Sequence, residues 1–350
     1  MRLWHDFLRE RGASFVAATV RDFGDSGAEL GAARDTAVLC DLAPWGVIAI
    51  EGPDATSFLQ GQFTNDVTRL ETGASQRSAW CSPKGRVLAN FLLRRASAER
   101  FELLLPAALV EPVVKRLRMY VLRAKVAVAD ASGETVRLGL GGPAAAACIA
   151  ATVAATPPVH RSTTLEGATL IVLADNRFLL LAAPESAPAL WNTLAEGARP
   201  AGFASWHWLA VRAGVPIVTP ATQDMFLPQM LNLDALGALA FDKGCYTGQE
   251  IVARTQYLGR LKERLALAHA HAPPPVAGAR LYAHAFGDQP CATVADAAPA
   301  PEGGTDLLAV VQIAALEDGL RLGARDGPPV ELLPLPYAVP AAGARPGRKA

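Results

Sequence analysis

A glycine-rich segment at residues 243–250, with the sequence KGCYTGQE, carries the residue types most able to do chemistry. Thr247 and Glu250 have the spacing of a capping box, which predicts that a helix begins here. Cys245 would lie just ahead of that helix, where the partial positive charge of the N-terminus favours a thiolate. Lys243, two residues away, could add to this effect. The segment therefore predicts an activated and accessible thiol.

A purely structural interpretation of the same residues stays open. Free cysteine is among the most frequently buried residue types, so Cys245 could simply pack inside a turn. Gly244 and Gly248 would then serve only the backbone geometry of that turn. The residues alone do not decide between the two interpretations.

Basic residues downstream could hold an anionic tail or RNA phosphates, although such runs are usually a solvated face. The whole chain has 33 Lys and Arg against 33 Asp and Glu, so bulk charge does not favour binding to nucleic acid. Direct contact with tRNA would depend on this local cluster. It consists of Arg254, Arg260, Lys262 and Arg264.

Two tryptophan regions could supply flat surfaces for a ligand. Trp45 stands just before a predicted strand, and Trp206 and Trp208 flank His207. Flat aromatic side chains suit stacking against a heteroaromatic ring such as a pterin. Packing in the core is the commoner fate of a single tryptophan, and the sequence leaves both alternatives open.

The elements that must position these residues follow a pattern that occurs twice. Strands are predicted at 47–51 and 136–140, each followed by a Gly-Pro step and a helix. Strands at 101–105 and 178–181 are each followed by a proline and a helix. In the first copy, Ser-Pro-Lys-Gly at 82–85 predicts the turn of a hairpin. The repetition predicts a pseudo-duplicated α+β body.

From about Leu265 the chain changes to short apolar runs separated by Pro, Gly and Asp, which predicts a small β-barrel. The expected fold class is therefore α+β, with three lobes and a tail. The predicted boundaries are a first α+β lobe at 1–135, a second at 136–262, the barrel at 263–338 and a disordered tail at 339–350.

The remaining composition excludes several classes of protein. Five scattered cysteines without a C-x-x-C pair argue against a disulfide framework and against a self-contained zinc or iron–sulfur site. The uncharged stretch at 138–160 is mostly Ala, Gly and Pro, too weakly apolar to insert into a membrane. No apolar signal segment follows Met1. We expect a soluble, cytoplasmic protein with no metal site of its own and no membrane partner.

The octapeptide at 243–250 resembles the signature of the YgfZ family. These are folate-binding relatives of the glycine-cleavage T-protein, implicated in iron–sulfur enzyme maintenance and tRNA modification. Supporting matches include FLQGQ at 58–62, TNDV at 64–67, AGVP at 213–216 and LPLPY at 333–337. The resemblance implies a three-lobed, ring-like fold with tetrahydrofolate, or a related folate, in the central opening.

The resemblance also implies roles for individual residues. Trp45 and Trp206 match the tryptophans that the family uses at the folate site, and Tyr246 and Arg254 are expected to bind folate with them. Cys245 matches the functionally required cysteine, with Lys243 beside it. These assignments place the thiol close to the bound folate.

Departures from the T-protein pattern bear on catalysis. T-proteins carry two aspartates where this chain has Ala89 and Asn90, and a pterin-contacting glutamate where it has Arg212. Neither Ala89 nor Asn90 can act as an ionised carboxylate beside a reacting nitrogen. The resemblance thus favours a folate-binding accessory protein that supports assembly or repair of iron–sulfur enzymes, including those that modify tRNA. Its partners would be those client enzymes or assembly proteins. The alternatives are a folate-dependent aminomethyl transferase or demethylase, and a protein that binds RNA directly.

Overall fold

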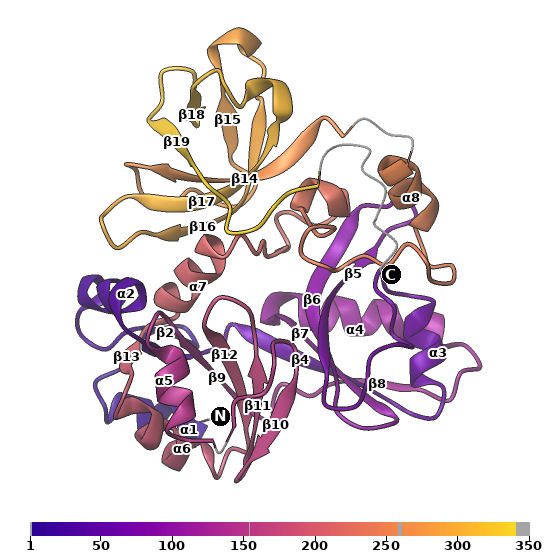
Figure 1. Cartoon of the computed structure of the whole chain (residues 1–350), viewed down its shortest axis with the longest axis vertical. Helices are drawn as coiled ribbons and strands as arrows, with labels where there is room; N and C mark the ends of the chain where they lie inside the picture. Colours follow the sequence, from indigo (N-terminus) through magenta and orange to yellow (C-terminus); the bar gives the residue numbers. More distant parts are fainter. Residues whose placement is uncertain (1, 154, 258–260, 341–350) are drawn as a thin grey trace.

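The structure, a computed structural model, describes residues 2–153, 155–257 and 261–340. Two α+β lobes and a β-barrel surround the middle of the molecule (Figure 1). Each of the two lobes is built on one mixed or antiparallel sheet, and the barrel lies above them in that view. The predicted fold class, a duplicated α+β body with a C-terminal barrel, is confirmed.

The first lobe contains a five-stranded antiparallel sheet with helices α3 (Ala55–Gln60) and α4 (Ala107–Val121). Helix α4 follows a strand directly at Pro106 and buries an apolar stripe that includes Leu109, Val113 and Leu117. In spatial order the strands are β5 (Ser75–Cys81), β6 (Val87–Arg95), β7 (Arg100–Pro106), β4 (Trp45–Glu51) and β8 (Ala127–Asp130).

The second lobe contains a six-stranded sheet with helices α5 (Ala145–Ala150) and α6 (Ala187–Ala195). In spatial order its strands are β10 (Ser162–Leu165), β11 (Ala168–Val172), β12 (Arg177–Ala182), β9 (Val136–Gly141), β3 (Val38–Asp41) and β13 (Arg199–Ala201). Strands β9 and β12 are buried along their whole length, and apart from Arg137 and Arg177 they consist of apolar residues and glycine.

The two sheets share the strand pairing that the repeated pattern predicts, and the same backbone conformation at the glycine that follows the strand. In each lobe the strand before the Gly-Pro step pairs with the strand before the second helix: β4 with β7, and β9 with β12. Gly52 and Gly142 both adopt positive φ, at 141° and 115°. Glycine reaches this region at little cost, so the same residue type ends both strands in the same way.

The structure divides the chain differently from the predicted boundary at residue 135. Strand β3 pairs with β9 on one side and with β13 on the other, so residues 38–41 lie inside the second sheet. Trp4 donates a hydrogen bond to Asp41 at 2.9 Å, which ties the N-terminus to the same lobe. The elements that precede β3 are α1 (Arg2–Arg9), β1 (Ser14–Val16), β2 (Thr19–Asp22) and α2 (Ser26–Asp35).

The C-terminal part forms a closed six-stranded barrel, which packs on helix α7 (Phe203–Arg212). In order around the barrel the strands are β14 (Glu263–Ala270), β17 (Thr305–Gln312), β16 (Ala292–Pro299), β15 (Arg280–Tyr282), β18 (Leu320–Leu322) and β19 (Pro329–Leu333). Within the described ranges the remaining elements are helix α8 (Gln249–Tyr257) and three short 3₁₀ helices: η1 (Pro228–Leu231), η2 (His284–Phe286) and η3 (Ile313–Ala315).

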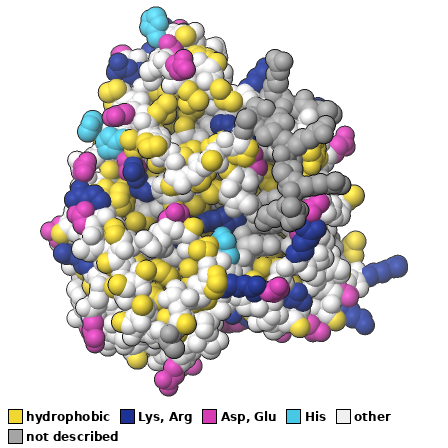
Figure 2. All heavy atoms as spheres, in the orientation of Figure 1, with side chains coloured by type: hydrophobic (Ala, Val, Ile, Leu, Met, Phe, Trp, Pro, Cys, Tyr) yellow, Lys and Arg dark blue, Asp and Glu magenta, His cyan; other side chains and the backbone are white. Residues whose placement is uncertain are grey.

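The surface mixes both signs of charge. Basic and acidic side chains are interspersed over the face that Figure 2 shows, as the equal counts of the two kinds lead one to expect. Across the described ranges, no helix combines the length and the apolar character needed to cross a membrane.

Candidate functional site

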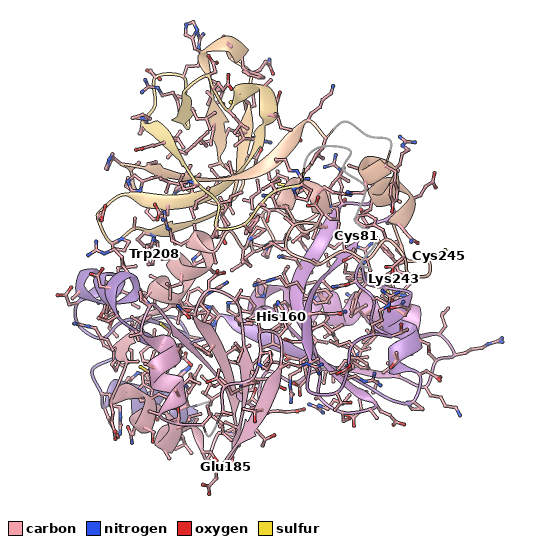
Figure 3. The ribbon with its side chains drawn as sticks, in the orientation of Figure 1. Cys81, His160, Glu185, Trp208, Lys243 and Cys245 are labelled. Carbon is pink, nitrogen blue, oxygen red and sulfur yellow. The ribbon has the colours of Figure 1, made fainter. Side chains whose placement is uncertain are left out.

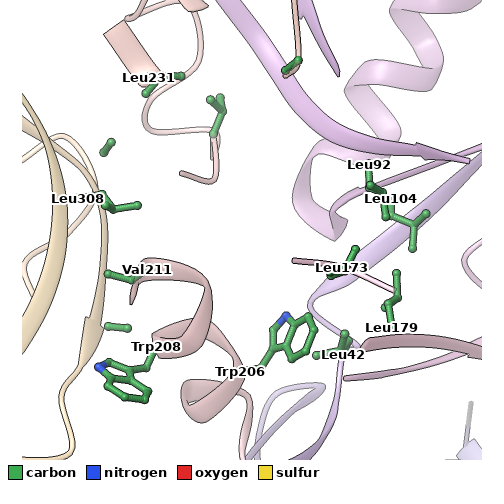
Figure 4. Packing of buried hydrophobic residues seen from close by; sticks show 14 of the residues in the cluster. Leu42, Leu92, Leu104, Leu173, Leu179, Trp206, Trp208, Val211, Leu231 and Leu308 are labelled. Atoms are coloured by element: carbon green, nitrogen blue, oxygen red, sulfur yellow. The ribbon is translucent and has the colours of Figure 1, made fainter. Parts of the chain in front are cut away.

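A cavity lies between the two lobes beside helix α7. The empty space within it, part of which is open to solvent, is about 730 Å³, and its lining is mainly aliphatic and aromatic. Trp45 reaches it from the start of β4 and Trp206 from α7. Figure 4 shows the Trp206 ring facing Leu42, Leu173 and Leu179. The two tryptophans that the sequence singled out therefore line the same cavity.

Glycines in β9 make room for the Trp206 ring. A Cβ atom on Gly139 would lie 2.6 Å from Cε3 of Trp206, and one on Gly141 would lie 2.6 Å from Cδ1 of Leu209. Helix α7 can pack this close to the sheet because neither position carries a side chain. The indole N–H of Trp206 is buried and has no acceptor among the described residues. A buried donor without an acceptor lowers the stability of the folded protein, so this N–H is suited to donate a hydrogen bond to an acceptor atom of a ligand.

Trp208 serves a different purpose. Its Nε1 donates a hydrogen bond to Oδ2 of Asp306 in the barrel at 2.8 Å. Asp306 also lies 2.8 Å from Nδ1 of His269 and 3.6 Å from Nη1 of Arg212. Trp208 and Arg212 thus fasten α7 to the barrel, and neither lines the cavity that holds Trp206.

The cavity wall contains Asn90, whose side-chain amide is hydrogen-bonded at both its nitrogen and its oxygen. Its Nδ2 donates to the carbonyl of Pro216 at 2.7 Å, and its Oδ1 accepts from the N–H of Val218 at 2.9 Å. The neighbouring Ala89 is fully buried. No aspartate or glutamate occurs among the described residues that line the cavity. The site therefore offers no carboxylate as a general base.

Two arginines line the cavity, and the sequence reasoning missed both. Arg177, the first residue of β12, is 3% exposed, and its Nε and Nη2 have no hydrogen-bond partner among the described residues. Its guanidinium carbon lies 5.8 Å from the centre of the Trp206 ring. Arg77, from β5, lines the same space. A signal for Arg177 existed, because it is the one charged residue in the otherwise apolar strand RFLLLA.

Cys245 lies elsewhere, in the loop that precedes α8. Its side chain is exposed, which excludes the interpretation of a cysteine packed inside a turn. Figure 3 shows it at the edge of the molecule, close to Lys243. Cys245 does not line the cavity of Trp45 and Trp206, so the expectation that the thiol would share an opening with these rings is not met.

Lys243 anchors the loop instead of facing the thiol. Its ammonium group donates three hydrogen bonds of 2.5–3.0 Å to backbone carbonyls in the segment between α3 and β5. These are the carbonyls of Gln60, Phe63 and Asn65. Burial lowers the pKa of Lys243 to about 8, and the charge of Asp66 opposes this shift. The side chain therefore remains largely protonated at pH 7 and acts as a clamp.

The rest of the loop is held by packing against the β5–β6 hairpin. Gly248 has φ of 84°, and a Cβ atom there would lie 2.4 Å from the carbonyl oxygen of Ser82. The buried ring of Tyr246 lies 5.1 Å from the Lys243 ammonium, a cation–π contact. Oε1 of Gln249 accepts from the N–H of Tyr246 at 3.2 Å, so the glutamine caps the turn that begins α8. This is a different bond from the predicted Thr247–Glu250 box.

Comparisons with known proteins agree with this architecture. Residues 5–240 match the family described as the GCVT N-terminal domain. The tRNA-modifying protein YgfZ of Shigella boydii serotype 4 (strain Sb227) is 34% identical over 236 residues, 67% of this chain and 72% of that protein. The protein of the same name from Klebsiella pneumoniae (strain 342) has the same identity and coverage. The chain belongs to the YgfZ family.

A solved structure shows the same fold. The glycine cleavage system aminomethyltransferase T from Bartonella henselae superposes with a TM-score of 0.75, covering 94% of this chain and 95% of that one. Sequence identity is 19%, so the likeness concerns the fold alone. The YgfZ chain thus keeps the T-protein architecture around a cavity whose described lining contains no carboxylate.

The residues predicted for the site of this YgfZ-family chain fall into two groups. Trp45 and Trp206 lie in the cavity, whereas Cys245, Lys243 and Tyr246 belong to the loop. Arg254 is exposed on α8 and does not line the cavity either.

The described members of the predicted basic cluster differ in exposure. Arg264 forms an ion pair of 2.7 Å with Asp234 and is largely buried, while Lys262 and Arg254 are exposed. Arg260 lies outside the described residues.

Proposed function

We propose that this YgfZ-family protein binds a tetrahydrofolate-type cofactor in the cavity between its lobes. We further propose that it acts as an accessory protein in the assembly or repair of iron–sulfur enzymes, including those that modify tRNA. The observation that carries the proposal is the apolar cavity with Trp45 and Trp206 in one lining. The printed name of the relatives, tRNA-modifying protein, supports the link to tRNA modification.

The lining fits a flat heteroaromatic ring. The Trp206 indole offers a ring face and an unpartnered N–H, and Trp45 adds a second aromatic surface. Ser78 adds a hydroxyl to the same wall. A tetrahydrofolate bound here would supply one-carbon carrying capacity, while the chain's own residues bind, orient and shield its ring.

Binding without aminomethyl transfer is the activity that the side chains favour. Proton transfer at a folate nitrogen calls for a positioned acid or base. Asn90 cannot supply one, because a carboxamide does not ionise near neutral pH; its amide is instead hydrogen-bonded to the backbone at Pro216 and Val218. The described lining offers no carboxylate in its place. The lining thus supports an accessory role for the protein, in which the cofactor is bound without aminomethyl transfer.

Cys245 would act outward in this proposal, on a partner protein. Its thiol is exposed, whereas Cys40, Cys81 and Cys291 are buried. A lone cysteine cannot hold an iron–sulfur cluster, which normally takes four ligands. Contact with a client's cluster or thiol at the surface is the role that this position allows.

Tryptophan fluorescence with tetrahydrofolate tests the binding half of the proposal. We expect Trp45→Leu and Trp206→Leu each to weaken binding at least tenfold, because each removes a stacking surface. Trp208→Phe is the matched control on the same helix and should bind as the wild type does. Unchanged affinity in both cavity variants would refute the site.

Genetic complementation tests the second part of the proposal, the accessory role in assembly or repair of iron–sulfur enzymes. Cells that lack their own protein of this family should regain iron–sulfur enzyme activity with the wild-type chain and with Cys148→Ala. Cys245→Ala should fail to restore it although the purified variant still binds tetrahydrofolate. Full restoration by Cys245→Ala would remove the thiol from the mechanism.

A further inference from the structure

Two arginines in the cavity carry charge that the protein itself does not balance. Neither Arg77 nor Arg177 forms an ion pair or a side-chain hydrogen bond within the described part of the chain. Burying a guanidinium without a counter-charge is strongly unfavourable, because the group loses its hydration and gains nothing in return. Proteins keep such an arrangement where a ligand completes it.

The free edge of Arg177 has the geometry of an acid-binding site. The two nitrogens without partners, Nε and Nη2, lie on the same side of the planar guanidinium. This edge forms two parallel hydrogen bonds to the two oxygens of a carboxylate. The remaining packing holds the edge in place, because β12 is buried along its length and the Trp206 ring lies beside the guanidinium.

The surroundings do not supply the missing anion. Asp175 is the carboxylate whose field reaches both arginines, but it is exposed and pairs with neither. Burial and then the charge of Arg77 lower the pKa of His160 to about 4, so this imidazole is neutral at pH 7. Burial, and to a smaller degree Arg77, lower the pKa of Arg177 to about 9, which leaves it charged at pH 7.

We propose that the cavity binds its ligand through a carboxylate, which Arg177 holds in a bidentate manner with Arg77 as a second cation. The identity of the ligand rests on the proposed function: a tetrahydrofolate carries carboxylates on its glutamate, at the end opposite the pterin. The ligand's acid-bearing p-aminobenzoylglutamate end therefore contacts the arginines.

The test compares three probes in equilibrium binding: tetrahydrofolate, p-aminobenzoylglutamate, and a tetrahydropterin that lacks the glutamate tail. We expect Arg177→Met to weaken binding of the first two at least tenfold and to leave the tetrahydropterin unchanged. Arg177→Lys should recover only part of the loss, since lysine keeps the charge but lacks the fork. Arg77→Met should act in the same direction, and it serves as the test on its own if Arg177→Met does not fold.

The outcomes separate this proposal from the proposed function. Binding of tetrahydrofolate that is insensitive to both arginine variants refutes the carboxylate site and leaves the folate proposal standing. The wild type could instead bind p-aminobenzoylglutamate in an arginine-dependent way and fail to bind tetrahydrofolate. That result refutes the folate proposal and leaves the carboxylate site standing. A wild type that binds none of the three probes refutes both, and an equal loss of all three in Arg177→Met refutes the assignment to the acid-bearing end.

Discussion

The cavity and the Cys245 loop differ in how their functional groups are presented. The cavity assembles residues from both lobes, and two of its buried polar groups, the Trp206 indole N–H and the Arg177 guanidinium edge, have no hydrogen-bond partner among the described residues. In the loop the polar groups are satisfied internally, as with Lys243, and the thiol is exposed. The first region is a cavity lined by buried side chains, and the second presents a thiol at the surface.

One segment connects the two regions. Lys243 donates to the carbonyl of Asn65, and the Asn65 side chain donates in turn to the carbonyl of Arg77 at 2.8 Å. The Asn65 N–H also donates to the hydroxyl of Ser78 at 3.2 Å. Both Arg77 and Ser78 line the cavity. The signature loop therefore helps to position the cavity wall, although its cysteine does not enter the cavity.

Replacing Lys243 should have the largest effect on this connection. Lys243→Met leaves three backbone carbonyls without their donor, which we expect to lower the free energy of unfolding by about 3 kcal/mol. Because Asn65 loses its anchor, tetrahydrofolate should also bind more weakly. Urea denaturation and fluorescence titration measure the two effects.

The matched control for Lys243 is Cys245→Ala, two residues along the same loop. Its exposed side chain makes no bond that holds the fold, so stability should change by less than about 0.5 kcal/mol. Equal destabilisation by the two variants would contradict the division between clamp and thiol.

A pair of glycine substitutions compares the packing of the two regions directly. Gly139→Ala places a Cβ atom against the Trp206 ring and should cost about 2 kcal/mol of stability through overpacking. It should also displace the ring and weaken cofactor binding. Gly244→Ala meets nothing within 4 Å and should be nearly neutral in both measurements. If Gly139→Ala binds as the wild type does, the Trp206 ring does not form part of the binding surface.

Local patterns in the sequence were sufficient to predict the repeated framework. The Gly-Pro steps at Gly52 and Gly142 mark the ends of β4 and β9 because only the residues around each step are needed to form the turn. Ser82 to Gly85 likewise closes its hairpin with a bond between its own ends, from the Gly85 N–H to the Ser82 carbonyl at 2.8 Å. Such features depend on short stretches of chain.

The features that the sequence did not reveal depend on distant partners. Strand β3 pairs with β9 in the second sheet, where Cys40 lies opposite Gly139, about a hundred residues later in the chain. Lys243 finds its acceptors about 180 residues earlier, at Gln60 and Phe63. Whether Arg177 is paired could not be inferred from its neighbours in β12, because the answer depends on what the other lobe brings to the cavity.

Lowering the pH should reduce the stability of the folded protein through His160, by less than the Lys243→Met and Gly139→Ala substitutions do. The folded-state pKa of His160 is lowered to about 4 from an ordinary value of 6.5 by burial and by Arg77. The unfolded chain therefore binds more protons between these values, and the contribution of His160 to stability is complete above pH 6.5 and is lost as pH falls towards 4. Because the side chain is partly exposed, we expect a loss of about 1 kcal/mol.

His160→Asn is a suitable reference, since asparagine does not titrate and tolerates the positive φ of 63° at this position. The stability difference between the wild type and His160→Asn, measured by urea denaturation from pH 7 to pH 4.5, should shift against the wild type as the pH falls. A difference that stays constant over that range would show that burial and the charge of Arg77 do not lower the pKa of His160 in the folded protein.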